Sequence, residues 1–243
     1  MISVCMAVFN GEQFLERQLE SILKQLGDDD EIVIVNDASE DNTVVIIDSM
    51  HDPRIRLLEN KKNIGPLKSF EKSVGEARGD YIFFADQDDL WLPNKVQYVI
   101  DCFISSRVLA VVTDAKVANE KEEIMHESYF KWRNSGPGFL KNFYKNSFLG
   151  CCMAIRKECK DFILPFPPFS YMHDRWIGLA CTMVGEVRFL PCPLLIYRRH
   201  ESTVTQMKPS CIWKIFNLRF FLVLSLVMVS LRLLRFRRFL FLP

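Results

Sequence analysis

The sequence predicts an α/β fold in which a mostly parallel sheet is flanked by helices, followed by a hydrophobic and basic C-terminal helix. Short runs of almost purely apolar residues alternate with segments in which apolar residues recur every three or four positions. Such near-continuous apolar strands are typical of parallel sheets that are covered on both faces. Apolar residues make up 49% of the 243 residues, which is enough to bury a core of this kind.

Four strand–helix pairs account for the first hundred residues. The predicted elements are a strand over Ile2–Phe9, a helix face from Leu15 to Leu26, a strand over Ile32–Val35, a helix over Thr43–Met50, a strand over Ile55–Leu58, a helix face from Leu67 to Ala77, a strand over Tyr81–Ala85 and a helix face from Leu92 to Phe103.

The second half of the chain is less regular. The predicted elements are a strand over Val108–Thr113, a long loop with one short helix over residues 119–147, a strand over Phe148–Ile155, a helix over Asp174–Val184 and short strands over Val187–Leu190 and Leu194–Tyr197. We expect one domain over residues 1–205 and a helical tail over residues 206–243.

The net charge of +1 hides an asymmetry. From residue 207 onward there are seven basic residues and no acidic one, so the remainder carries 24 basic and 30 acidic residues. An acidic body with a basic, apolar tail is typical of a peripheral membrane protein and argues against a nucleic-acid partner. The eight cysteines lack metal-ligand spacing and are expected to be reduced thiols. The first residues are expected to form a strand and not a signal peptide.

Polar residues follow each of the first four strands. In open α/β sheets, ligands bind beyond the carboxyl ends of the strands. The loops concerned are Phe9–Glu12, Asn36–Ser39, Asn60–Gly65 and Asp86–Asp89, and we expect them to converge on one rim.

The segment Asp86-Gln87-Asp88-Asp89 places three carboxylates directly after a buried strand. Neighbouring carboxylates repel one another unless a cation lies between them. Mg²⁺ or Mn²⁺ prefers oxygen ligands and can hold both a carboxylate and substrate phosphates, so we predict a metal–diphosphate site here. The alternative is an acidic turn in which Asp89 caps the helix that starts near Leu92.

No phosphate-binding glycine loop of the P-loop or G-x-G-x-x-G type is present, which argues against a P-loop nucleotidase and an NAD enzyme. A diphosphate would therefore be held by metal and side chains. Asp37 can accept hydrogen bonds from a base or ribose, or can instead form a turn leading into the next helix. Asn63 and Gly65 can approach the nucleoside in the same way.

Two later segments complete the predicted site. His173-Asp174 begins an apolar helix, where Asp174 is either a general base or an N-cap. Tyr197-Arg198-Arg199-His200 ends a strand, and its two guanidiniums and imidazole suit a diphosphate. The alternative for this last segment is a solvated strand end.

The order and spacing of these motifs resemble glycosyltransferase family 2, whose members are inverting enzymes with the Rossmann-like GT-A fold. The resemblance covers roughly residues 1–205. It rests on the segments Ser3–Gly11, Val35–Thr43, Asn63–Gly65, Ala77–Ile82 and Asp86–Trp91. The Asp-Gln-Asp-Asp-x-Trp form, with residues 173–176 and 197–200, is most similar to bacterial rhamnosyltransferase-like members, which build surface polysaccharides.

The resemblance implies a role for each matched residue. The implied roles are the nucleoside pocket for Ala7, Phe9 and Glu12, the base contact for Asp37, the D-x-D pair for Asp86 and Asp88 with Asp88 as the direct metal ligand, and the catalytic base for Asp174. Arg198 and His200 would hold the diphosphate, and His200 would also be a metal ligand. Two departures stand out: Lys68-Ser69 replaces an asparagine often found near Phe70, and His173 replaces the glutamate of a common Glu-Asp pair.

These roles imply a glycosyltransferase that depends on Mg²⁺ or Mn²⁺. It would move a sugar, with rhamnose as a candidate, from a nucleoside-diphosphate sugar to a saccharide or lipid-linked acceptor. The acceptor oxygen would attack the anomeric carbon opposite the diphosphate, with one carboxylate as base. Two alternatives stay open: a nucleotidyltransferase, which would normally need a glycine- and basic-rich loop after the first strand, and a non-catalytic nucleotide-sugar-binding subunit of a membrane assembly.

Residues 212–242 are apolar and basic. The longest uncharged run, Phe220–Leu231, has 12 residues and would cover about 18 Å as a helix, short of the ~30 Å hydrocarbon core. Snorkelling of the flanking arginines could lengthen the run. We favour a helix that lies in the membrane interface with its basic residues on anionic headgroups, on the cytoplasmic face of the inner membrane. The alternative is a helix docked on the protein or used as an oligomer contact.

Overall fold

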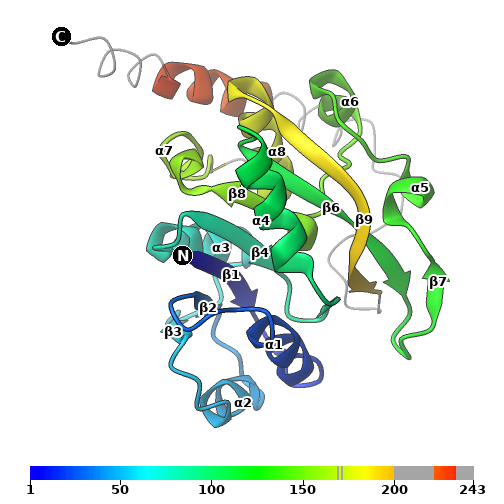
Figure 1. Ribbon diagram of the computed structural model, residues 1–243. Coiled ribbons are helices and arrows are strands. Elements are labelled where there is room, and N and C mark those ends of the chain that lie inside the picture. Colours follow the sequence, from blue (N-terminus) through cyan, green and yellow to red (C-terminus); the bar gives the residue numbers. More distant parts are fainter. Residues whose placement is uncertain (169, 171, 200–221, 234–243) are drawn as a thin grey trace, which may run out of the picture.

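One curled nine-stranded sheet organises the molecule, with helices packed on both of its faces (Figure 1). The computed structural model describes residues 1–168, 170, 172–199 and 222–233. The strands lie in the order β3-β2-β1-β4-β8-β6-β9-β5, and β7 pairs with β6. Their bounds are β1 Ile2–Val8, β2 Glu31–Asn36, β3 Ile55–Glu59, β4 Tyr81–Ala85, β5 Leu90–Trp91, β6 Ala110–Ala118, β7 Ile124–His126, β8 Met153–Arg156 and β9 Val187–Arg198.

The helices connect these strands. Their bounds are α1 Leu15–Leu23, α2 Thr43–Ser49, α3 Pro66–Glu76, α4 Lys95–Ser105, α5 Tyr129–Arg133, α6 Phe139–Tyr144, α7 Lys160–Ile163 and α8 His173–Val184, with single 3₁₀ turns at Gly150–Cys152 and Lys157–Cys159. Residues 222–233 form a further helix.

The first half of the sheet confirms the prediction. β1 pairs in parallel with both β2 and β4, and β2 pairs in parallel with β3. β1, β2 and β4 are buried along almost their whole length, because α1 and α3 cover the sheet beside them. Every predicted strand–helix pair is present, and the predicted ends differ from the observed ones by a few residues at most.

The second half requires a correction, because the sheet is mixed there and not mostly parallel. β8 lies between β4 and β6 and is antiparallel to both. β9 is parallel to β6, and the two-residue strand β5 is antiparallel to β9. An antiparallel strand needs no helical crossover. The alternation of strands and helices that predicted the first half of the sheet therefore does not indicate where β8 lies. The segment predicted as a long loop with one short helix contains β7, α5 and α6.

Two strands predicted at the end of the domain are one strand, β9. Its register against β6 shifts at Asp114, which pairs with Pro193 while the neighbouring Thr113 pairs with Leu190. Pro191 and Pro193 have no N–H to donate to a ladder, and such positions are typical of bulges. The prolines therefore interrupt the pairing without ending the strand.

The helix over residues 222–233 packs one face on the domain. Leu222, Leu226 and Val229 are buried in the same core as the sheet, and Arg232 donates hydrogen bonds to the carbonyl oxygens of Phe162 at 3.0 Å and Pro165 at 2.8 Å. Among the described residues, no helix has both the length and the apolar character needed to cross a membrane. The other tail residues, including 212–221 and 234–242, lie outside the described ranges.

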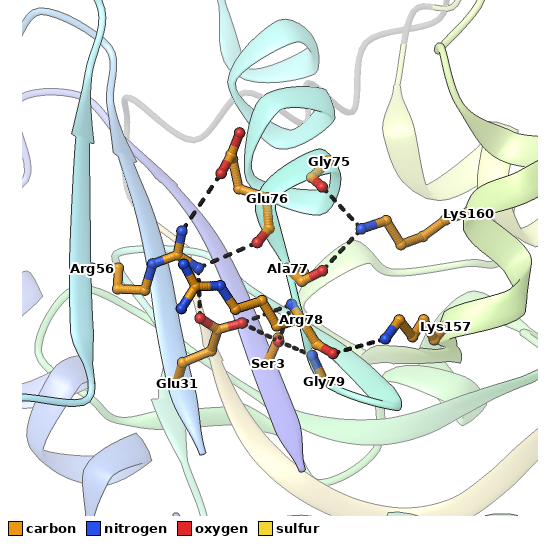
Figure 2. A network of polar contacts seen from close by, with 10 residues as sticks. All are labelled: Ser3, Glu31, Arg56, Gly75, Glu76, Ala77, Arg78, Gly79, Lys157 and Lys160. Carbon is orange, nitrogen blue, oxygen red and sulfur yellow. Dashed lines mark hydrogen bonds and ion pairs between the residues drawn. The ribbon is translucent and has the colours of Figure 1, made fainter. Parts of the chain in front are cut away.

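A polar network closes the amino edge of the parallel strands (Figure 2). The buried carboxylate of Glu31 accepts hydrogen bonds from the Ser3 hydroxyl at 2.6 Å, the Arg56 guanidinium at 2.6 Å and the Arg78 N–H at 2.7 Å. Burial alone would raise the pKa of Glu31, but these donors hold it below its usual value. Lys160 donates to the carbonyl oxygens at the end of α3, where a cation is favourable.

The network brings Gly79 directly against β1. A Cβ atom at Gly79 would lie 2.5 Å from the backbone nitrogen of Ser3 and 2.7 Å from the carbonyl carbon of Ile2. Gly75, four residues earlier in α3, has no atom within 4 Å of such a Cβ.

We therefore expect Gly79→Ala to destabilise the protein by about 1–3 kcal/mol, because backbone must move to admit the methyl group. The matched control, Gly75→Ala, should stabilise α3 by up to about 1 kcal/mol, because alanine is the better helix former. Urea denaturation followed by circular dichroism measures both. Equal effects of the two substitutions would contradict the close approach at Gly79.

Candidate active site

The four loops at the carboxyl ends of the parallel strands converge, as predicted. The Asn10 N–H donates to the Ser39 hydroxyl at 3.0 Å, and the Asn10 side-chain oxygen accepts from the Glu40 N–H at 2.9 Å. Glu12 accepts two hydrogen bonds from Asn42, from the backbone at 3.1 Å and the side chain at 2.8 Å. These contacts join the loop after β1 to the loop after β2.

Gln87 joins the loop after β1 to the acidic loop after β4. Its side-chain oxygen accepts from the Phe9 N–H at 2.8 Å, and its amide donates to the Phe9 carbonyl oxygen at 3.0 Å. A Cβ at Gly11 would lie 2.8 Å from the same Gln87 oxygen, so the glycine makes this approach possible. The Phe9 ring remains exposed at the rim, and Ala7 lies partly exposed at the end of β1.

Asp37 holds the loop that contains Asn63 and Gly65. One carboxylate oxygen accepts from the Asn60 side chain and the Ile64 N–H, both at 2.9 Å, and the other accepts from the Gly65 N–H at 2.8 Å. The turn into α2 is closed instead by the neighbouring Asn36, whose side chain accepts from the Ser39 N–H. The alternative interpretation of Asp37 as a turn residue is therefore wrong, and its carboxylate orders the third loop of the rim.

The acidic loop contains a compact group of possible metal ligands. Donor atoms of Asp86, Asp89 and Cys151 all lie within 4.8 Å of one another. Asp89 is 1% exposed; one of its oxygens accepts from the Arg198 N–H at 3.1 Å, and the other is buried without a hydrogen-bond partner. α4 begins only at Lys95 and has no side-chain cap, so the alternative of Asp89 as a helix cap is wrong. Asp88 is not part of this group.

The polar side of α1 supports this acidic loop. The fully buried Gln18 donates to the Asp86 carbonyl oxygen at 2.8 Å, and the Ser21 hydroxyl accepts from the Trp91 N–H at 3.0 Å. Gln25 bridges the Leu92 carbonyl oxygen and the Val96 N–H. Uncharged side chains of α1, together with Gln25 just after this helix, thus fix the backbone around the carboxylates.

The electrostatics of the group reflect burial and like charges. Burial, followed by the negative charges of Asp88 and Asp174, raises the pKa of Asp86 to about 7. The same burial raises the pKa of Asp89 well above its usual value. Lys95 lies beneath the loop, 1% exposed, with its ammonium 2.7 Å from the Cys151 carbonyl oxygen and 4.5 Å from the centre of the Trp91 ring. Its positive charge partly offsets the repulsion at Asp86.

Asp174 lies in the first turn of α8 and is 2% exposed. Its oxygens accept from the Asn146 side chain at 3.1 Å and from the Arg175 N–H at 2.6 Å. The N-cap of α8 is Met172, so the interpretation of Asp174 as the N-cap is wrong. Burial raises the pKa of Asp174 to about 6. A Cβ atom at Gly150, the neighbour of Cys151, would lie 3.6 Å from the Asp174 Cβ, so Asp174 lies beside the group of Asp86, Asp89 and Cys151.

His173 fixes the start of α8 by packing. Its imidazole stacks on the Phe70 ring with 4.0 Å between centroids. A Cβ at Gly150 would lie 2.5 Å from the imidazole Nε2, so glycine allows this contact too. Burial lowers the pKa of His173 to about 3, which keeps the ring neutral at physiological pH. His173 therefore positions its neighbour Asp174 without adding charge.

The end of β9 is not the solvated strand end of the alternative interpretation, and the diphosphate contact of Arg198 stays a prediction. Arg198 is 5% exposed, so it is not part of a solvated strand end. Its guanidinium forms an ion pair with Glu122 at 2.9 Å and lies 4.5 Å from the centre of the Phe14 ring. The guanidinium of Arg199 lies instead beside Trp132 of α5. His200 lies outside the described residues.

Several residues of this site gave no signal in the sequence. Asn146 belongs to a segment predicted as loop, 28 positions before its partner Asp174. Glu122 lies in the turn between β6 and β7, and Lys95 is a single basic residue at the start of a helix. Only their contacts in the folded chain distinguish them from surface residues.

Fold and site together define a class: an enzyme of the α/β type with buried carboxylates at the carboxyl edge of its sheet. Residues 3–161 match the family described as glycosyl transferase family 2. The chain belongs to this family and is a glycosyltransferase.

Individual relatives agree with this assignment. The chain is 23% identical over 211 residues to the UDP-Glc:alpha-D-GlcNAc-diphosphoundecaprenol beta-1,3-glucosyltransferase WfgD of Escherichia coli, with 86% of this chain and 81% of WfgD covered. It is 29% identical over 219 residues to the dTDP-rhamnosyl transferase RfbG of Shigella flexneri, with 81% and 72% covered. The crystal structure of S. aureus TarS 1–349 with UDP-GlcNAc matches with a TM-score of 0.72 at 16% identity, over 92% of this chain and 66% of that one. This likeness shows a shared GT-A fold.

We expect metal-free Asp86→Asn to be more stable than the wild type at pH 8. Because the folded-state pKa of about 7 lies above the usual value of 3.8, this carboxyl contributes stability below about pH 4 that is lost as the pH rises through 7. The gain should be on the order of 1–2 kcal/mol at pH 8 and should vanish near pH 4. Urea denaturation in EDTA measures it.

The control is Asp80→Asn, at an exposed carboxylate that pairs with the amino terminus, and it should change little at either pH. A loss of stability in Asp86→Asn at pH 8 would show that the ionised carboxylate is stabilised in the folded state.

Proposed function

We propose that the chain is a metal-dependent, inverting glycosyltransferase that moves a sugar from a nucleoside-diphosphate sugar to a saccharide or lipid-linked acceptor in bacterial surface polysaccharide synthesis. The observation that carries the proposal is the position of Asp174 beside the group of Asp86, Asp89 and Cys151, which brings a possible base next to a possible metal group. The names of WfgD and RfbG support the choice of donor and acceptor classes.

The donor set of the acidic loop fits a hard divalent cation. Asp89 holds a buried oxygen without a partner, and Asp86 contributes a second carboxylate. Burial raises the pKa of Cys151 well above its usual value, so this residue stays a thiol, whereas Mg²⁺ and Mn²⁺ select oxygen ligands. A bound cation would neutralise charge on the departing diphosphate. Asp88, the carboxylate between Asp86 and Asp89 in the same loop, is proposed as the direct ligand, and His200 is proposed as a further ligand.

Asp174 is suited to the role of base. A carboxylate with a pKa of about 6 is largely ionised at neutral pH and is more basic than an ordinary aspartate. Asn146 and the backbone of Arg175 fix its orientation and leave lone pairs for an acceptor hydroxyl. One base on the acceptor side suits direct attack with inversion at the anomeric carbon.

The rim loops are proposed to hold the nucleoside. Phe9 offers an exposed ring, and Asp37 keeps Asn63 and Gly65 at the same rim. Ala7 and Glu12 complete the proposed pocket. The two relatives are named for different donors, UDP-glucose for WfgD and dTDP-rhamnose for RfbG, so rhamnose and glucose are the first sugars to test.

Asp174→Asn is expected to lower the transfer rate by about 10²–10⁴-fold, because the amide cannot take the acceptor proton. Nucleotide binding should persist. A thermal-shift panel of UDP, dTDP, UDP-glucose and dTDP-rhamnose with and without Mn²⁺ measures binding, and release of the nucleoside diphosphate measures turnover.

The companion variant Asp88→Asn should lose the Mn²⁺-dependent part of the thermal shift, whereas Asp101→Asn, on the exposed side of α4, should keep it. If Asp174→Asn also abolished nucleotide binding, Asp174 would be a structural residue and the assignment of the base would fail.

The location at a membrane surface is a separate proposal, supported by the helix over residues 222–233. Its buried face contains Leu222, Leu226 and Val229, and its opposite face exposes a second apolar set, Val223, Leu224, Val227 and Leu231. Basic residues flank this helix in the sequence. A docked helix with an exposed apolar face and basic flanks suits insertion among anionic lipids on the cytoplasmic side, in a peripheral or monotopic manner.

The double variant Val227→Glu/Leu231→Glu is expected to release the protein from vesicles of phosphatidylglycerol and phosphatidylethanolamine, because both positions are at least half exposed and charged side chains resist insertion. Ile104→Glu, on α4 and 73% exposed, is the control and should leave binding unchanged. Vesicle sedimentation measures the bound fraction. Unchanged sedimentation of the double variant would place any membrane contact elsewhere.

A further inference from the structure

The carboxylate of Glu122, in the turn between β6 and β7, connects α1 to the end of β9. Both of its oxygens accept hydrogen bonds from the Arg17 guanidinium of α1, one of them at 3.1 Å. One of the two also accepts from the Arg198 guanidinium at 2.9 Å. The end of β9 therefore lies between α1 and the β6–β7 hairpin (Figure 1).

The two segments that Glu122 joins are the ones that hold the acidic loop. On α1, Gln18, which follows the arginine in the sequence, donates to the Asp86 carbonyl oxygen at 2.8 Å. On β9, the Arg198 N–H donates to the Asp89 carboxylate at 3.1 Å. A continuous series of hydrogen bonds thus leads from Glu122 to the group of possible metal ligands.

The backbone of Glu122 lies in the left-handed region, with a φ of 65°. Glycine and asparagine favour this region, so a glutamate here lowers the stability of the turn. Asn119 holds the turn: its side-chain oxygen accepts from the N–H groups of Lys121 and Glu123, both at 3.0 Å, and its carbonyl oxygen accepts from the Glu122 N–H at 3.0 Å. None of these contacts uses the Glu122 side chain, which is therefore explained by the two arginines that it binds.

Arg198 keeps a hydrogen-bond donor for a ligand. Its guanidinium lies 4.5 Å from the centre of the Phe14 ring, and within the described residues its Nε atom is buried and forms no hydrogen bond. Two guanidiniums share one carboxylate, so the group retains a positive charge after pairing. A buried guanidinium of this kind, on a residue that contacts the acidic loop, suits an anion with several oxygens.

We propose that Glu122 is a positioning residue for the donor substrate: it fixes the Arg198 guanidinium where the donor diphosphate meets the acidic loop. Arg198 contacts the diphosphate, and Glu122 acts through Arg198 without touching the donor. Arg17 anchors the carboxylate to α1. This inference rests on the proposed function, which puts the diphosphate at the metal group of Asp86 and Asp89.

The test measures binding, so it does not depend on turnover. Ligand-observed NMR titrations in Mg²⁺ compare UDP and dTDP with their nucleosides, uridine and thymidine. Glu122→Gln should weaken the nucleoside diphosphates about tenfold, because Arg198 loses its charged partner, and should leave the nucleosides unchanged, because they carry no phosphate. Loss of a negative charge by itself predicts the opposite, tighter binding of an anion. The control Glu127→Gln removes an exposed carboxylate that pairs with Lys116 and should change neither class of ligand.

Two further variants separate position from charge. Glu122→Asp keeps the charge and suits left-handed backbone, so it is the safer variant for folding. Its shorter side chain cannot reach both arginines, so the nucleoside diphosphates should weaken about threefold or more. In an Arg198→Gln background, Glu122→Gln should cause no additional loss, because the two residues act as one unit.

Unchanged binding of UDP and dTDP in both Glu122 variants would overturn the proposal. So would additive losses from Glu122→Gln and Arg198→Gln, which would show that Glu122 does not act through Arg198. Equal losses for diphosphates and nucleosides would also overturn it, because they would indicate a general structural role. Failure of the proposed function would appear separately, as a wild type that binds neither UDP nor dTDP, and this inference would fail with it.

Discussion

Repulsion among carboxylates is the constraint on which this structure depends. Asp86, Asp88 and Asp89 follow one strand, and Asp174 of α8 lies beside them. Little positive charge is buried with them, apart from Lys95. The fold instead fixes the surrounding backbone with neutral donors and acceptors of α1 and with the pairing of β5 and β9. The carboxylates are thus held together by the fixed backbone, and their mutual repulsion is only partly offset by a buried positive charge.

The two edges of the parallel strands hold buried carboxylates that differ in the number of hydrogen bonds they accept. Glu31 at the amino edge receives three donors, and its pKa is held low. Asp89 at the carboxyl edge is just as buried but receives one backbone donor and keeps an oxygen without a partner. A buried carboxylate whose oxygens all accept hydrogen bonds is stable in its ionised form and stabilises the fold. A buried carboxylate oxygen without a hydrogen-bond partner lowers the stability of the fold.

Periodicity and turn chemistry were sufficient to predict the first four strand–helix pairs and the convergence of their loops, because these features depend on local sequence. The family resemblance, and not periodicity, assigned Asp86 and Asp174 to one predicted active site. The position of β8 between β4 and β6 could not be predicted in this way, because an antiparallel strand is not joined to its neighbours by a helical crossover that the sequence pattern reveals. Partners such as Asn146 and Glu122 were also missed, because a long-range contact is encoded by the fold and not by the neighbours in sequence. The folded chain places the Arg198 guanidinium beside Glu122 and Phe14 and the Arg199 guanidinium beside Trp132, and local sequence predicts none of these contacts.

The way Asp37 holds its loop has a consequence for divergence within the family. Two of its three partners are backbone N–H groups, at Ile64 and Gly65, and only Asn60 contributes a side chain. The contacts that Asp37 makes with the loop thus involve none of the side chains at residues 61–64, all four of which are exposed. Of these four, Asn63 still helps to shape the loop, because its side chain accepts a hydrogen bond from the Gly65 N–H at 3.1 Å. Residues 61, 62 and 64 can therefore vary while Asp37 keeps the backbone of the loop in place, so the sequence of this exposed segment can diverge faster than its shape.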